Sequence, residues 1–201
     1  MLCYILLTSQ LSADKIMAEA WEKVSQAKSI SVTKLQTTEE FKRDLRVKFY
    51  FRAGGYVRVE KPLLTDISNP KQAWTFRTSK KTYQSKAAVP VSFNINSLLG
   101  IEMFNSGLPI LSGPSPVVWH NHSTLRIELD GRKVMTTRTK LFVYVAPKTH
   151  LPIGISANLG SVTQVTIYEN LKVNQPLSDS LFNFVPPAGW TKSMESPRGR
   201  R

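Results

Sequence analysis

Three apolar runs with very short connections, near the end of the chain, constrain the fold most strongly. They are Leu141–Val145, Leu151–Ala157 and Val162–Tyr168, and each is rich in β-branched or aromatic residues. A Pro-Lys-Thr-His turn joins the first two runs, and Asn-Leu-Gly-Ser joins the next two. Parallel strands need a crossover of roughly a dozen residues or more, so these connections predict an antiparallel meander.

Upstream residues repeat the strand pattern. In Lys42–Arg52, Leu45, Val47, Phe49 and Phe51 alternate with Arg46, Lys48, Tyr50 and Arg52. This period of two predicts one apolar face and one cationic face. Ala53-Gly54-Gly55 predicts a tight turn into Tyr56–Lys61. Further strand signals are Ser29–Thr38, Gln72–Arg77, Lys81–Ser85, Val117–Asn121 and Ser123–Leu129, with an Asp130-Gly131 hairpin signal after the last.

Altogether the sequence predicts about ten or eleven short antiparallel strands, and a sheet of that width curls. Pro186 and Pro187 are expected to end it, because proline donates no backbone hydrogen bond. We predict a mainly β (α+β) fold, in which a strongly curved antiparallel sheet forms an unclosed β-barrel.

Two helical segments are expected to cover this sheet. Ala13–Lys28 has apolar residues at the spacing of one helix face, with Ser12 or Asp14 as its cap. Ser97–Phe104 suits a short helix within the proline-rich stretch between Ala87 and Pro116, where strand pairing is expected to be poor. The glycine- and proline-rich flanks of this short helix make it a candidate lid, and the alternative is a buried helix that closes one end of the core.

Charge favours an anionic partner. The net charge is +13, and Lys42–Lys86 holds twelve Lys or Arg residues against three acids. Such an excess favours an anionic membrane surface, an acidic protein or nucleic acid. The alternative is an ordinary solvated outer sheet face.

The first residues resemble the end of a secretory signal that lacks its basic start, with cleavage after Ala13. The alternative is an ordinary apolar N-terminal strand. The single cysteine, Cys3, allows no disulfide framework. No stretch approaches the length of a membrane-spanning helix.

The order of these segments resembles the periplasmic lipoprotein-carrier superfamily, which comprises LolA/LolB-like proteins and their outer-membrane lipoprotein-sorting relatives. The resemblance covers about Ala13 to Trp190, and its motifs are individually weak. They are Ala13–Lys28, Phe49–Lys61, Trp74-Thr75-Phe76, Lys81-Thr82-Tyr83, Asp130-Gly131, the turn Ala146–Pro152 and the closing Leu181–Pro187. The resemblance implies an unclosed barrel lidded by helices that holds acyl chains outside the cytoplasm without a cofactor.

Inward aromatic and aliphatic residues are the predicted ligand site. An acyl chain is held by apolar area, at roughly 0.8 kcal/mol per buried methylene. The predicted wall comprises Phe49, Phe51, Trp74, Phe76 and Tyr83, and the predicted lid comprises Phe93, Leu98, Leu99, Met103 and Phe104. The alternative is that the same residues fill a closed core.

Other chemistries have weaker support. His120 and His122 would share a strand face, but no third metal ligand is evident, so we expect exposed edge-strand histidines and no metal. Glu128 and Asp130 are attributed to turn chemistry, and no nucleophile elbow or phosphate loop is present, so we expect neither catalysis nor a cofactor. Aromatic residues within the basic stretch could stack on nucleic acid, but Trp74 and Phe76 alternate as inward positions do, so we expect no nucleic-acid partner.

The predicted organisation is a truncated signal segment over residues 1–13, a LolA/LolB-like lipid-binding domain over 14–190 and a disordered basic tail over 191–201. The predicted function is a monomeric, periplasmic or otherwise extracytoplasmic carrier, non-enzymatic, for a lipid or lipoprotein acyl chain. The alternative is a protein-binding or envelope-stress-sensing domain of the same fold.

Overall fold

The computed structural model describes residues 12–38, 44–88, 96, 99–133 and 139–193. Within them lie the α-helix α1 (Ala13–Ser25), two further α-helical positions at Asn96 and Leu99, and four 3-10 turns, η1 (Thr78–Lys80), η2 (Ile101–Asn105), η3 (Gly131–Lys133) and η4 (Asp179–Phe182). The strands are β1 (Ser29–Thr38), β2 (Leu45–Arg52), β3 (Tyr56–Glu60), β4 (Thr65–Ser68), β5 (Gln72–Arg77), β6 (Thr82–Ala87), β7 (Ile110–Trp119), β8 (His122–Asp130), β9 (Lys140–Val145), β10 (Pro152–Asn158), β11 (Thr163–Val173) and β12 (Thr191–Lys192).

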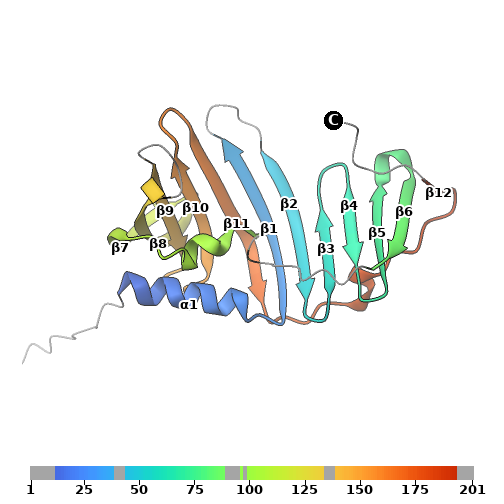
Figure 1. The fold of residues 1–201 in the computed structure, drawn as a ribbon, viewed down its shortest axis with the longest axis horizontal. Helices are drawn as coiled ribbons and strands as arrows, with labels where there is room; N and C mark the ends of the chain where they lie inside the picture. The colour runs from blue at the N-terminus through green and yellow to red at the C-terminus, as the bar shows by residue number, and fades with distance from the viewer. Residues whose placement is uncertain (1–11, 39–43, 89–95, 97–98, 134–138, 194–201) are drawn as a thin grey trace, which may run out of the picture.

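All twelve strands belong to one sheet, with the order β12-β6-β5-β4-β3-β2-β1-β11-β10-β9-β8-β7 (Figure 1). Every neighbouring pair is antiparallel except β12 and β6. Because β7 and β12 lie at opposite ends of this order, the sheet is not closed. The predicted mainly β, unclosed architecture is confirmed, with β4 and β12 added to the predicted strands.

The C-terminal meander is confirmed. β10 pairs with both β9 and β11, and β11 then pairs with β1. This last pairing joins the two halves of the chain, because β1 also pairs with β2. The glycine turn between β2 and β3 is present, with φ of +89° at Gly54 and Gly55, a region that favours glycine.

Helix α1 covers one side of the sheet and packs its apolar face into the core. The Ser12 side chain caps the helix by accepting a hydrogen bond from the Lys15 backbone N–H at 3.3 Å. Ile16, Ala20 and Val24 are buried. The helix ends at Ser25, three residues before the predicted Lys28. Since Ser12 and Ala13 begin the helix, the domain boundary predicted at residue 13 falls inside it.

Predictions for the proline-rich middle need correction. The start of the predicted helix Ser97–Phe104 is α-helical where it is described, because Leu99 is helical and the Gly100 N–H donates to the Asn96 carbonyl oxygen at 2.8 Å, but the chain continues from Ile101 as the 3-10 turn η2. Poor strand pairing up to Pro116 is wrong, because β7 begins at Ile110 and continues through Pro114 and Pro116. β7 lies at the end of the sheet, and its pairing with β8 is interrupted by register shifts. Proline is tolerated at such an edge, where one side of the strand makes no ladder hydrogen bonds.

Two further turns differ from the prediction. Asp130 pairs with Lys140, so the connection is longer than a two-residue hairpin. A Cβ on Gly131 would lie 2.5 Å from the Thr139 carbonyl oxygen. Glycine is therefore needed here because the two backbone segments lie too close together for a side chain. Pro186 and Pro187 do not end the sheet, because β12 follows them. Thr191 and Lys192, predicted to lie in a disordered tail, form that strand.

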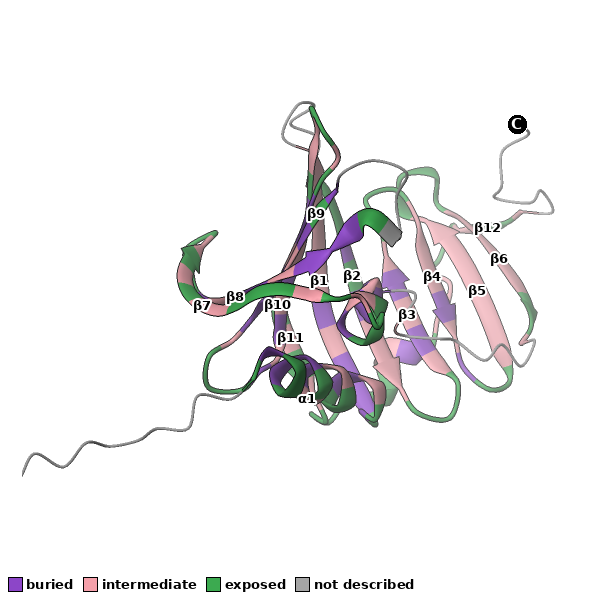
Figure 2. Ribbon diagram, turned by 60° about the vertical axis from the view of Figure 1, so that its left-hand side comes forward, coloured by how far each residue is buried: buried purple, intermediate pink, exposed green. Residues whose placement is uncertain are grey.

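The pairing register divides the side chains between two faces of the sheet. The inner face carries Val32, Phe49 and Val143, and it is the face that α1 and η2 cover. The outer face carries Lys48, Arg58 and Trp74. Figure 2 shows α1 and the buried stretches of neighbouring strands beneath it.

Candidate functional site

Apolar side chains from both halves of the sheet form a continuous inner face. Phe49 on β2 lies between Val32 on β1 and Val59 on β3 and is 6% exposed. The other buried members on these strands and on β8, β9 and β10 are Ile30, Val47, Val57, Ile127, Leu129, Leu141, Val143, Val145 and Ala157. Phe51 is half-buried against the same cluster. The described inner face is therefore packed, as the closed-core alternative predicted, although it belongs to one curved sheet.

Residues Leu99–Asn105, here named the cover segment, supply the apolar side chains that complete this packing. Leu99, Ile101 and Phe104 are buried in the core cluster, and Met103 packs against it half-buried. Glu102 and Asn105 are exposed. The cover segment contains no strand and thus makes no ladder hydrogen bonds with the sheet it covers. The predicted lid residues Phe93 and Leu98 lie outside the described residues.

The predicted single wall of aromatic residues is wrong. Phe49 shares the inner face with Asp66 and Thr75, through consecutive pairs across β3, β4 and β5. Trp74, Phe76 and Tyr83 alternate with those positions and lie on the outer face. The structure therefore places Phe49 and Phe51 on one side of the sheet and the other three aromatic residues on the opposite side.

Residues Asn174–Ser193, here named the C-terminal strap, cover the outer aromatic residues. The Phe76 ring stacks on Phe184 with centroids 4.4 Å apart, and Trp190 meets Phe76 edge-on at 5.8 Å. Tyr83 also contacts the Phe184 ring, with centroids 5.7 Å apart. The predicted wall residues on this face thus belong to a second, structural cluster.

Polar contacts also fix the strap to the outer face. The Arg52 guanidinium lies 4.0 Å from the Tyr56 ring centroid and pairs with Asp179, and this hydrogen bond raises the pKa of Arg52 above its ordinary value. Asn69 Nδ2 donates to the Phe182 carbonyl oxygen at 3.2 Å. The strap is therefore held by charge-assisted and aromatic contacts together.

Lys34 and Tyr168 lie within the apolar part of the inner face, and sequence analysis missed both. Lys34 on β1 is directly paired with Tyr168 on β11 and Val47 on β2. The buried Tyr168 hydroxyl donates to the Leu99 carbonyl oxygen at 2.9 Å, and burial raises the pKa of Tyr168. Burial also lowers the pKa of Lys34. The sequence did indicate that Lys34 faces inward, because Lys34 continues the period-two alternation of Ile30 and Val32.

Helix α1 is tied to the turn before β10. His150 Nδ1 and Glu19 Oε2 lie 2.7 Å apart, and Lys23 Nζ donates to the Thr149 carbonyl oxygen at 2.7 Å. The hydrogen bond with His150 lowers the pKa of Glu19 below its ordinary value. His150, which has a φ of +53°, thus anchors the helix that covers the inner face.

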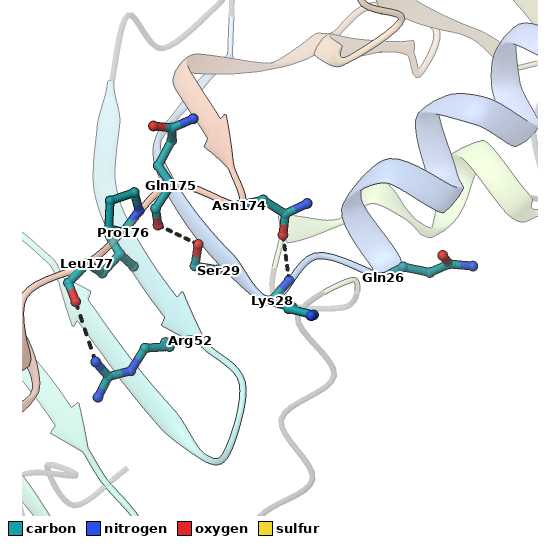
Figure 3. A pocket seen from close by; sticks show the side chains of 8 residues that line it. All are labelled: Gln26, Lys28, Ser29, Arg52, Asn174, Gln175, Pro176 and Leu177. Carbon is teal, nitrogen blue, oxygen red and sulfur yellow. Dashed lines mark hydrogen bonds between the residues drawn. The ribbon is translucent and has the colours of Figure 1, made fainter.

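A pocket of about 640 Å³ lies where the end of α1, the start of β1 and the C-terminal strap meet (Figure 3). Its lining residues are Gln26, Lys28, Ser29, Arg52, Asn174, Gln175, Pro176 and Leu177. Several of its polar atoms are already bonded: Ser29 Oγ donates to the Gln175 carbonyl oxygen at 2.6 Å, and Asn174 Oδ1 accepts from the Lys28 N–H at 2.8 Å. The pocket is open, and six of its eight lining residues are polar or charged, so it is a poor site for an acyl chain.

The cationic outer face is partly neutralised. Register confirms that Arg46, Lys48 and Arg52 share the outer face of β2. Arg46 pairs with Glu169 at 3.1 Å, and Arg58 on β3 pairs with Glu60 at 2.7 Å. With Arg52 held by Asp179, these arginines are less available to an anionic partner than the sequence suggested.

Metal ligands do not gather in the described part of the chain. His120 lies in the two-residue turn between β7 and β8, so its predicted place on a strand is wrong, although it and His122 are exposed. The backbone and guanidinium N–H groups of Arg132 donate to the Asp130 carboxylate, as turn chemistry predicts. Among the described residues, no helix is long and apolar enough to cross a membrane.

Comparisons with solved structures identify the class of fold. An uncharacterised conserved protein from Thermus thermophilus matches with a TM-score of 0.52 and 11% identity, covering 91% of this chain and 100% of that one. LprF from Mycobacterium bovis matches with a TM-score of 0.53 and 8% identity, covering 82% and 94%. MucB matches with a TM-score of 0.50 and 12% identity, covering 86% of this chain and 62% of MucB.

These likenesses confirm the LolA/LolB-like fold predicted from the sequence. At such low identity the likeness concerns the fold alone. In sequence comparisons, no protein-family model and no curated protein matched the chain.

Proposed function

We propose that this protein is an extracytoplasmic, non-enzymatic carrier that binds the acyl chain of a lipid or lipoprotein against the inner face of its sheet. The observation that carries the proposal is the continuous apolar inner face under a cover without strand pairing. Side chains from both halves of the sheet, such as Val32, Phe49 and Val143, contribute to it.

In this proposal the ligand takes the place of the cover segment. Leu99, Ile101 and Phe104 occupy the apolar surface in the structure, much as an acyl chain would. Moving them aside exposes apolar area, and an entering chain regains the lost burial at roughly 0.8 kcal/mol per methylene. Exchange of one apolar occupant for another needs no cofactor.

A second candidate is protein or peptide binding in the sense of an envelope-stress sensor. It is favoured by the inner face of β4 to β6, where Asp66, Thr75 and Gln84 replace the apolar residues. Thr75 Oγ1 donates to Asp66 Oδ1 at 2.7 Å. This polar half of the inner face suits an extended peptide better than a hydrocarbon.

Titration with a fluorescent fatty acid tests the carrier proposal. We expect saturable binding by the purified protein and displacement of the probe by an unlabelled fatty acid. A matched pair of variants locates the site: Phe49→Ser on the inner face should weaken binding, and Tyr50→Ser on the outer face of the same strand should not. Absence of saturable binding by the folded wild-type protein would contradict the proposal.

A further inference from the structure

Lys34 and Tyr168 lie side by side within the apolar part of the inner face. The two residues are direct partners across β1 and β11, and both face inward. Along the inner face of β1, Ile30 and Val32 are buried, whereas Lys34 is half-buried and so is Gln36 beyond it. Lys34 therefore marks the boundary between the packed apolar end of the inner face and a more accessible polar end.

The cover segment begins directly at these two groups. Tyr168 Oη donates to the Leu99 carbonyl oxygen at 2.9 Å, and a Cβ on the next residue, Gly100, would lie 3.7 Å from Lys34 Nζ. A ligand that displaces Leu99 removes the acceptor of the Tyr168 hydroxyl. The same displacement exposes the Lys34 ammonium at the edge of the apolar strip.

An anionic oxygen is the group that best replaces these contacts. A hydroxyl deprived of its acceptor in an apolar environment is costly, and hydrogen bonds to a charged acceptor are stronger than neutral ones. An anion beside the Lys34 ammonium also adds a favourable charge interaction at the same place. The acyl chain would then extend along β1 toward Val32 and Ile30.

We propose that Lys34 and Tyr168 form a headgroup subsite and that the ligand is a single-chain anionic amphiphile, with a carboxylate or phosphate next to its acyl chain. This inference rests on the proposed carrier function and adds the chemical class of the ligand. Because the subsite is one ammonium and one hydroxyl, it selects an anionic headgroup over a neutral one.

The test compares three amphiphiles of equal chain length, each below its aggregation limit, by displacement of a fluorescent fatty acid from the full chain. Palmitate carries a carboxylate, hexadecyl phosphate carries a phosphate, and hexadecanol is neutral. The wild-type protein is expected to prefer at least one of the anionic compounds over hexadecanol by about tenfold, which corresponds to about 1.4 kcal/mol, because hydrogen bonds to a charged acceptor are stronger than those to a neutral one. The stronger of the two anionic compounds identifies the headgroup.

Lys34→Met tests the subsite itself, with Lys48→Met as the matched control. Lys48 lies on β2, where it pairs with Thr33 of β1 on the outer face of the sheet. Lys34→Met should abolish the preference for the anion while leaving hexadecanol affinity unchanged, Tyr168→Phe should reduce the preference, and Lys48→Met should retain it.

Equal wild-type affinity for all three amphiphiles, or a preference that survives in Lys34→Met, would overturn the inference while leaving the carrier function intact. If none of the three binds, the carrier function itself fails. The wild-type comparison requires no variant, so a variant that does not fold leaves the inference testable.

Discussion

Glu19 and His150 show how single side chains position the cover of the inner face. Their contact joins α1 to the turn between β9 and β10, and Lys23 adds a second contact to the same turn. The lowered pKa of Glu19 means that its ionised form is favoured by folding. A side chain on the exposed side of an amphipathic helix therefore helps to hold the buried side against the sheet.

Glu19→Gln is expected to lower the melting temperature at neutral pH. A group with a depressed folded-state pKa stabilises above its unfolded-state pKa, and this contribution is lost as pH falls through the lowered value. The difference between wild type and Glu19→Gln should thus be present at neutral pH and disappear in acid. Thermal melts across pH check this, with Glu22→Gln on the same helix as control. Equal melting temperatures at neutral pH would contradict the assigned role.

The sequence predicted which side chains of one strand share a face. It did not always predict whether that face is the inner or the outer face of the sheet. Phe49 and Phe51 were assigned correctly to the side opposite Lys48 and Arg52. The in-phase pair Trp74 and Phe76 was assigned to the same wall, although it lies on the other face. Alternation fixes which residues share a face, whereas the choice of face depends on pairing across the Lys61–Leu64 connection.

At the scale of elements, the C-terminal strap explains why β5 turns its aromatic side chains outward. Phe182 is fully buried beside Tyr56, whose ring centroid lies 5.6 Å away, and Phe184 stacks on Phe76. The sequence showed Leu181–Pro187 as an apolar segment, but nothing local indicated the face on which it would dock. A contact between segments more than a hundred residues apart carries no short-range signature.

Phe182→Ala should destabilise the fold by about 3–5 kcal/mol, the usual cost of removing a buried phenylalanine side chain. Val185 is 83% exposed in the same strap, so Val185→Ala should change stability by less than about 0.5 kcal/mol. Urea unfolding of both variants measures the difference. Equal effects of the two substitutions would show that the strap does not dock as described.

The edge strand β7 shows the same limit of local reasoning. Its prolines argued against a strand, and the argument would hold in the middle of a sheet. At the end of the strand order, Pro114 and Pro116 are accommodated within an irregular edge. Edge position is a property of the whole topology, so the sequence of this segment alone did not reveal it.

At the scale of the molecule, one unclosed sheet presents two different faces. The inner face is apolar in its larger part and is covered by α1 and the cover segment, whereas the outer face carries paired cations and the strap. The central claim is that the ligand enters on the inner side. The four tryptophans divide between the two faces, which makes the claim measurable.

Trp21 on α1 packs against the inner cluster, whereas Trp74, Trp119 and Trp190 contact outer-face residues. Trp119 stacks on Tyr144 at 3.8 Å, on the face opposite Val143. Variants that retain one tryptophan each, with the others changed to phenylalanine, therefore report on a chosen face.

Quenching of each single-tryptophan variant by a brominated fatty acid is the most direct test, because bromine quenches indole fluorescence only at close range. We predict saturable quenching of Trp21 and no saturable quenching of Trp74, Trp119 or Trp190. Saturable quenching of Trp74 or Trp190 with Trp21 unaffected would place the ligand on the outer face and contradict the account.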